Sequence, residues 1–171
     1  MTGDFSLRAA TTADIPVLAG IWHRGWHEAH AHLLPPALTA HRTLPSFVER
    51  LGPMLPDLTV AVIREQPVGF CAIEHDELYQ LFVDPAGRGW WLAAALVRDA
   101  EERLAARGVR VAWLACAIGN DRAGRFYEKC GWSRVGTMIN PAVTPNGPWP
   151  LETWRYEKVL DPRPASPHPT D

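Results

Sequence analysis

Three strand-like runs, one long amphipathic helix and a fourth strand-like run follow one another in the middle of the chain, and this order constrains the fold most. The runs 58–63 and 68–73 are separated by REQP, which predicts a hairpin turn, and a third run covers 77–83. Apolar residues at helical spacing then predict a helix over 88–107, and the apolar run 109–116 predicts a buried strand. This alternation predicts an α/β domain with a mixed sheet.

The ends of the chain extend the same pattern. Further elements are predicted, in chain order, as a strand at 5–9, a helix that begins after Thr11 or Thr12, a helix around 47–51, a helix at 120–130, and strands at 132–138 and 152–159. We therefore expect one domain over residues 1–160. The segment 161–171, DPRPASPHPTD, is rich in proline and poor in apolar groups, so we expect it to be disordered.

Composition excludes several classes of protein. A chain of 171 residues suits one domain with its own core, and a net charge of −2 leaves no basic surplus for nucleic acid or an anionic membrane. No apolar run approaches the roughly 20 residues of a membrane span, and no secretory signal is visible, so we expect a cytoplasmic protein. The three cysteines form no CxxC pair, which argues against a disulfide framework or a zinc site.

The turn before the central helix has the parts of a phosphate cradle. Val83 ends a strand, Pro85 stops it, Arg88 supplies positive charge and Gly89 has no side chain. The first backbone N–H groups of a helix lack partners within the helix, and the helix dipole makes that end positive. A pyrophosphate is a natural ligand for such an end. The alternative is an ordinary strand-to-helix turn with a surface arginine.

This turn resembles motif A of the GNAT-type N-acetyltransferases, whose pattern is Arg/Gln-x-x-Gly-x-Gly/Ala. A later segment resembles motif B of the same family, with the residues Asn120, Ala123, Phe126, Tyr127, Lys129, Gly131 and Trp132. The N-terminal WHEAHAHLLPPAL is similar to the first helix and following loop of many members. The resemblance implies a GNAT-like (acyl-CoA N-acyltransferase) fold, a mixed central β-sheet flanked by helices. It also implies acetyl transfer from acetyl-CoA to a primary amine.

Trp91 departs from the motif, because it stands where the pattern has its central glycine. At about 100° per residue, Trp91 projects away from the apolar face of the helix and onto the face that carries Arg98 and Glu102. If the helix is regular from Gly89, Trp91 covers the cofactor groove, packs under a loop or forms a contact between two copies of the chain. Trp90 lies at the edge of the apolar face. The position of Trp91 therefore leaves two questions undecided: whether the cofactor can reach the turn, and whether two copies of the chain form a homodimer through this residue.

The family resemblance assigns cofactor contacts to the strand before motif A, to the turn and helix start, and to the start of motif B. These residues are Leu81, Phe82, Val83, Arg88, Gly89, Trp90, Trp91, Leu92, Ala93 and Asn120. Tyr127 matches the family tyrosine that donates a proton to the leaving thiolate. Tyr127 is also compatible with a packing role beside Phe126, and Asn120 with a helix N-cap.

The general base is less directly marked. In some members it lies on the strand before motif A, six residues ahead of the last valine, and counting back from Val83 gives Glu77. Strand alternation places Glu77, Tyr79, Leu81 and Val83 on one face, where Glu77 and Tyr79 would line the acceptor cleft. A solvated turn residue is the alternative for Glu77, and a water chain is the alternative base.

The first helix carries aromatic and histidine side chains that suit an acceptor pocket. Trp26, His27 and His30, together with Tyr79, are the predicted substrate-binding residues, although Trp22 and Trp26 fit the core equally well. His23 and His27 are four residues apart, but no acidic partner completes a HExxH-type site, so no metal is expected.

Two classes of function remain after these arguments. The first is an N-acetyltransferase that uses acetyl-CoA as co-substrate and a small-molecule or peptide amine as acceptor. The second is a non-catalytic GNAT-fold binding or regulatory domain whose groove is altered by Trp91. A nucleotide-binding module of another fold would need a Walker pattern or a Rossmann glycine set, and the chain has neither.

Overall fold

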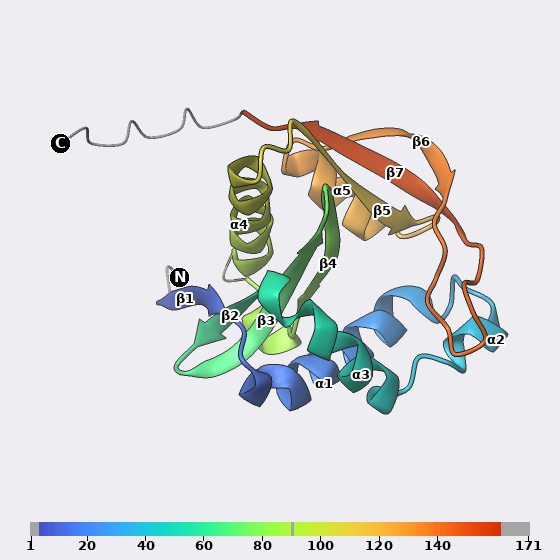
Figure 1. Ribbon diagram of the computed structural model, residues 1–171, viewed down its shortest axis with the longest axis horizontal. Helices are drawn as coiled ribbons and strands as arrows, with labels where there is room; N and C mark the ends of the chain where they lie inside the picture. Colours follow the sequence, from blue (N-terminus) through green and yellow to red (C-terminus); the bar gives the residue numbers. More distant parts are fainter. Residues whose placement is uncertain (1–3, 90, 162–171) are drawn as a thin grey trace.

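The structure, a computed structural model, describes residues 4–89 and 91–161 (Figure 1). The strands are β1 (Phe5–Ala9), β2 (Leu58–Ile63), β3 (Gln66–Glu74), β4 (Glu77–Val83), β5 (Val111–Ala117), β6 (Ser133–Ile139) and β7 (Glu152–Val159). The α-helices are α1 (Ile15–His30), α2 (Pro36–Thr39), α3 (Leu44–Met54), α4 (Leu92–Ala106) and α5 (Asp121–Lys129). Short 3₁₀ turns are η1 (Thr12–Asp14), η2 (Leu55–Asp57) and η3 (Pro85–Gly87).

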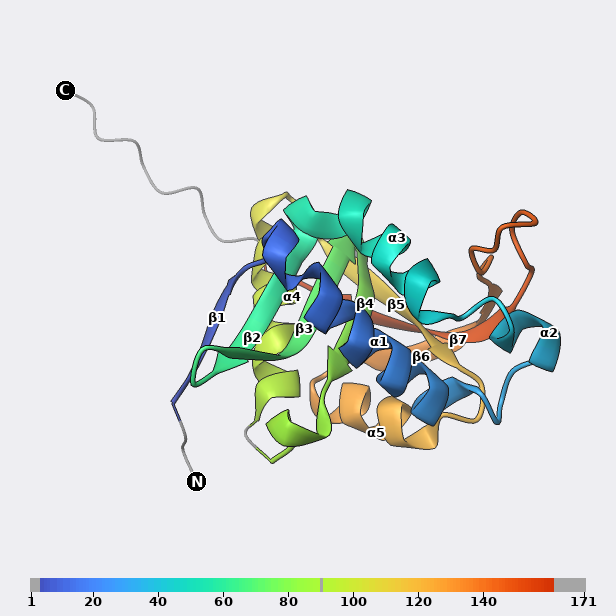
Figure 2. The same cartoon turned by 90° about the horizontal axis from the view of Figure 1, so that it is seen from below.

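All seven strands form one sheet in the order β1-β2-β3-β4-β5-β7-β6. Neighbouring strands are antiparallel except for β4 and β5, which run parallel because α4 connects them. Helices α1 and α3 cover one face of the sheet, and α4 and α5 cover the other (Figures 1 and 2). The sheet therefore has one apolar core on each face, and the predicted mixed α/β sheet is confirmed.

The only parallel pair in the described sheet is also its weakest junction. β4 and β5 pair at a single position, Glu77 opposite Trp113, and the strands run apart from there (Figure 1). A β-bulge between Ala72 and Ile73 of β3 shifts the register with β4 at the same level. The sheet is thus open between β4 and β5 toward their C-terminal ends.

The helix predicted from Arg88 begins four residues later, at Leu92. The reason is backbone conformation: Gly89 and Trp91 have φ angles of 82° and 62°, which a right-handed helix cannot contain. The residues just before them form η3 instead of a first helical turn. Trp90 lies outside the described residues, so its predicted position at the edge of the apolar face stays a prediction.

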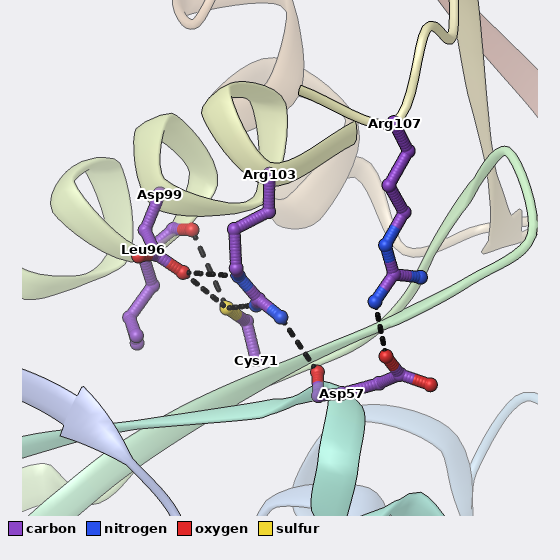
Figure 3. A network of polar contacts seen from close by, with 6 residues as sticks. All are labelled: Asp57, Cys71, Leu96, Asp99, Arg103 and Arg107. Carbon is purple, nitrogen blue, oxygen red and sulfur yellow. Dashed lines mark hydrogen bonds and ion pairs between the residues drawn. The ribbon is translucent and has the colours of Figure 1, made fainter. Parts of the chain in front are cut away.

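Helix α4 is tied to the sheet by a cluster of polar contacts (Figure 3). The Arg103 guanidinium donates to the carboxylate of Asp99 at 2.8 Å, to the backbone oxygen of Asp57 at 2.9 Å and to the Cys71 sulfur at 3.4 Å. Arg107 forms an ion pair with the Asp57 carboxylate. These contacts join α4 to η2 and β3, so they fix the helix whose N-terminus faces the opening between β4 and β5.

Candidate active site

A cavity of about 150 Å³ lies on the face of the sheet covered by α1 and α3. The first two helices, the end of α3, three strands and the loop 140–151 surround it. Its lining residues are Trp22, Trp26, His30, Leu34, Leu38, Arg42, Arg50, Glu77, Tyr79, Gln80, Ala115, Ala117, Asn140, Pro141, Ala142, Val143, Leu151 and Thr153. The cavity therefore borders the point at which β4 and β5 separate.

Glu77 is buried in this cavity wall, with 7% of its surface exposed. It lies within β4, so the alternative of a solvated turn residue is wrong. Burial raises the pKa of its carboxyl from 4.5 to about 8, and the nearby carboxylates of Glu74 and Asp76 act in the same direction. The Arg155 guanidinium partly opposes this shift. Glu77 is therefore a carboxyl that exchanges its proton near neutral pH.

The expectation that Glu77, Tyr79, Leu81 and Val83 share one face is wrong for the last two. Tyr79 and Phe82 pack against the core beneath α1 and α3, whereas Leu81 and Val83 pack against the core beneath α4 and α5. The register shift leaves one extra residue in β4, Tyr79, and this bulge interrupts the strict alternation that the prediction assumed. The side chains of Leu81 and Val83 thus point away from the cavity, and these two residues can reach a ligand in the strand opening through their backbone groups.

Three of the four predicted substrate-binding residues line the cavity: Trp26, His30 and Tyr79. Burial lowers the pKa of His30 to about 4, so its imidazole is neutral at pH 7. His27 does not line the cavity; its Nε2 lies 2.7 Å from the backbone oxygen of Arg42 and fixes the chain there. Trp26 is 7% exposed, so the core and pocket interpretations hold together for it.

Sequence reasoning missed two arginines in the cavity wall, Arg42 and Arg50. Arg42 is 5% exposed and donates to the backbone oxygen of Val143 at 2.6 Å, a residue 101 positions away in the chain. Arg50 donates to the Tyr79 hydroxyl at 3.1 Å. Neither arginine belongs to a recognisable motif. Contacts between segments far apart in the chain bring them into the cavity wall, and the local sequence does not reveal such contacts.

The turn between β4 and α4, here called the phosphate turn, is held in place by hydrogen bonds of its Asp84 and Arg88 side chains. The Asp84 carboxylate accepts hydrogen bonds from the Ala86 N–H and, at 2.6 Å, from Arg24. Arg88 donates to both carboxylate oxygens of Glu28, at 2.9 and 2.8 Å, which joins the turn to α1. Both partners of this second pair are well exposed, so it positions the turn more than it stabilises the fold.

Trp91 occupies the N-cap position of α4 with a left-handed backbone and an indole that is 78% exposed. The exposure agrees with the sequence expectation, but it comes from the φ angle of 62° and not from a regular helix starting at Gly89. The Trp91 side chain makes no capping hydrogen bond to this helix end. The backbone N–H groups in the first turn of α4 include that of the half-buried Ala93, and such groups have no partner within the helix.

Motif B supplies Asn120 and Tyr127 from α5. The Asn120 side chain accepts from the Ala123 N–H at 3.3 Å, so it is an N-cap, as one of its two interpretations required. Tyr127 is half-buried against Trp132 and Tyr156, on the face opposite the cavity, and burial raises the pKa of its hydroxyl. The two predicted catalytic residues thus lie on opposite faces of the sheet.

Across residues 4–89 and 91–161, no helix is both long and apolar enough to cross a bilayer. In the same part of the chain, no three His, Cys, Asp or Glu side chains gather as a group that could hold a metal ion.

Sequence comparison identifies relatives of the chain. The profile of the Acetyltransferase (GNAT) family matches residues 22–132. An uncharacterised N-acetyltransferase of Methanocaldococcus jannaschii is 31% identical over 84 residues, which make up 43% of this chain. The match spans 37% of that relative's length.

Solved structures share the fold over nearly the whole chain. A GCN5-related N-acetyltransferase from Rhodopseudomonas palustris superposes with a TM-score of 0.72 and 22% identity, covering 94% of this chain and 98% of that one. The PaiA N-acetyltransferase of Thermoplasma acidophilum, in complex with coenzyme A, has a TM-score of 0.65 at 15% identity over 92% and 99% of the chains. The yncA protein of Salmonella typhimurium, with its cofactor acetyl-CoA, has a TM-score of 0.64 and 18% identity, covering 98% of this chain and 100% of that one. These likenesses confirm the GNAT-like fold.

Proposed function

The chain belongs to the GNAT family of acetyltransferases, and we propose that it transfers the acetyl group of acetyl-CoA to a primary amine. The observation that carries this proposal is the opening between β4 and β5. It separates an uncapped helix end, suited to a pyrophosphate, from a cavity that contains a carboxyl with a pKa near neutrality. A thioester that lies in the opening is accessible from both faces of the sheet.

Acetyl-CoA would bind through the backbone of the turn and of β4. The N–H groups at the start of α4 would donate to the pyrophosphate, with the helix dipole adding favourable electrostatics. The unpaired edge of β4 from Leu81 to Val83 would hydrogen-bond the pantetheine arm and the thioester.

Glu77 is the proposed general base. The reacting amine must lose a proton as its nitrogen forms a bond to the thioester carbonyl carbon. A carboxyl with a pKa of about 8 is better matched to that proton than a solvated glutamate. The cavity brings Glu77 and Tyr79 to the same wall, where an acceptor amine can approach the opening.

Tyr127 is the proposed general acid. When the carbon–sulfur bond breaks, the coenzyme A thiolate takes a proton. The Tyr127 hydroxyl is protonated at pH 7, because tyrosine ordinarily has a pKa near 10 and burial raises the pKa of this one. Tyr127 lies on the other face of the sheet from Glu77, which suits a donor to the sulfur while Glu77 serves the nitrogen.

Trp91 is compatible with this cofactor site. Trp91 adopts a left-handed backbone conformation, which glycine, the residue at this place in the motif, adopts without strain. Its indole is 78% exposed, so it does not fill the groove by packing against the rest of the chain. This favours an enzyme over a binding domain with a closed groove.

Calorimetric titration with acetyl-CoA tests the cofactor site. Ala93→Asp places a carboxylate in the first turn of α4, where it suits the helix dipole but repels a pyrophosphate. We expect the wild type and the control Ala93→Ser to bind acetyl-CoA, and Ala93→Asp to lose binding while remaining folded. Equal binding by all three forms would place the pyrophosphate elsewhere and refute the proposed site.

A further inference from the structure

Arg42 is a buried cation with unused hydrogen-bonding capacity in the acceptor cavity. It is 5% exposed, and its guanidinium lies 5.7 Å from the centre of the Trp26 ring. One Nη donates to the Val143 backbone oxygen, but the buried Nε has no hydrogen-bond partner. Since an arginine carries five N–H donors, most of this one's capacity is free.

Arg50 reaches the same cavity from α3. Its guanidinium lies 4.4 Å from the centre of the Trp22 ring and donates to the Tyr79 hydroxyl. These contacts hold the side chain in place without neutralising it. Among the ion pairs of the described residues, none involves Arg42 or Arg50.

The rest of the cavity wall does not offset these two charges. Glu77 is its one acidic residue, and with a pKa of about 8 it is mostly neutral at pH 7. His30 is neutral as well. Burial and the neighbouring Arg50 lower the pKa of Arg42 to about 10, which still leaves it cationic. A buried charge without a partner is costly for the fold, so its presence points to a ligand that supplies the missing charge.

We propose that the acceptor is a small amino-carboxylate, such as a free amino acid, whose carboxylate binds Arg42 and Arg50 while its amine faces Glu77. The inference rests on the proposed amine acetylation. A planar guanidinium matches the two oxygens of a carboxylate. The cavity of about 150 Å³ suits an acceptor as small as an amino acid better than a protein side chain with its flanking backbone.

Matched acceptors test this assignment by steady-state kinetics with acetyl-CoA. Each set contains an L-amino acid, its α-amide and the amine that lacks the carboxyl group, for example phenylalanine, phenylalaninamide and phenethylamine. A dipeptide with a free α-amine completes each set. We expect kcat/KM for the preferred amino acid to exceed that for the amide, amine and dipeptide by about 10–100-fold, as for hydrogen bonds to a charged group.

Variants assign the preference to the arginines. Arg50→Gln removes the positive charge that lies over the Trp22 ring. We expect it to raise KM for the amino acid by about 10-fold or more and to raise KM for the matched amine by much less, because the amine has no carboxylate. Arg50→Lys should recover part of the preference, because it restores charge without the planar fork. Arg42→Gln should act like Arg50→Gln if it folds. The exposed Arg64, in the β2–β3 turn, supplies the control Arg64→Gln.

Calorimetric titration of the protein with amino acids, with and without saturating coenzyme A, tests binding to the carboxylate site without any catalytic turnover. If simple amines or dipeptides are acetylated as well as amino acids, or if Arg50→Gln leaves their ratio unchanged, the carboxylate site is refuted while acetyl transfer stands. If acetyl-CoA does not bind, the proposed function fails. In that case, absence of amino-acid binding in calorimetry would also overturn the carboxylate site.

Discussion

Replacing Glu77 by glutamine should change the pH dependence of stability in a way that its burial dictates. The carboxyl has a pKa of about 8 in the folded protein and an ordinary value of 4.5. The folded state therefore binds more protons than the unfolded state between these pH values. The stability contributed by Glu77 falls as pH rises through this window, and the neutral amide of Glu77→Gln removes that loss.

The magnitude follows from the same shift. Each pH unit inside the window changes the difference in unfolding free energy between Glu77→Gln and the wild type by about 1.4 kcal/mol. From pH 5 to pH 8, the variant should gain about 3 kcal/mol relative to the wild type. Urea unfolding of both proteins at several pH values measures this difference, and other titrating groups cancel in it.

Two further results belong to this prediction. The exposed Glu65, in the β2–β3 turn, supplies the control Glu65→Gln, which makes the same substitution outside the cavity. If Glu77 is also the base, Glu77→Gln should lose about 10²–10⁴-fold in turnover even though it is the more stable protein at pH 8. A stability difference that does not change between pH 5 and pH 8 would refute the argument that Glu77 is buried with a raised pKa.

Three other changes test separate parts of the structure. Trp91→Gly should stabilise the fold by about 1 kcal/mol, because glycine adopts φ near 60° without the steric cost that tryptophan bears, and should raise acetyl-CoA affinity; urea unfolding and calorimetry measure both, and weaker binding would make Trp91 a cofactor-stacking residue. Tyr127→Phe should lower turnover by about 10²–10⁴-fold with little change in acetyl-CoA affinity; unchanged turnover at every pH would leave Tyr127 a packing residue. Cys71 should resist thiol reagents at pH 8 until the protein unfolds, because burial raises the pKa of its thiol to about 12. The half-buried Cys130 should react first. Mass spectrometry of the labelled protein measures both rates, and labelling of Cys71 as fast as Cys130 would contradict this prediction.

The sequence predicted most elements because their patterns are local. Four strands lie at the predicted bounds, β1, β2, β4 and β7, and the turn between β2 and β3 has the positive φ angles of a tight hairpin at Arg64 and Glu65. The start of α4 was misplaced because apolar spacing cannot detect a single left-handed residue. Trp91 gives no propensity signal for that conformation, unlike the glycine usually found there.

The candidate site was predictable only where motifs mark it. The resemblance pointed to Glu77 and the phosphate turn, and strand alternation added Tyr79. The structure puts Glu77 and Tyr79 in one cavity wall. The bulge that turns Leu81 away from the cavity depends on pairing between strands, which the sequence of β4 does not reveal. Arg42 was missed because its environment comes from α1 and from the loop around Val143, far away in the chain.

The central claim is acetyl transfer to an amine, and its most direct test is detection of the product by mass spectrometry. The protein is incubated with acetyl-CoA labelled with ¹³C in the acetyl group and with a panel of amino acids and simple amines. We predict that a labelled N-acetyl product forms together with an equal amount of free coenzyme A, and that both depend on the protein. Binding of acetyl-CoA without any acetylated acceptor, across the panel and at pH 7 to 9, would contradict the account and favour a GNAT-fold binding domain.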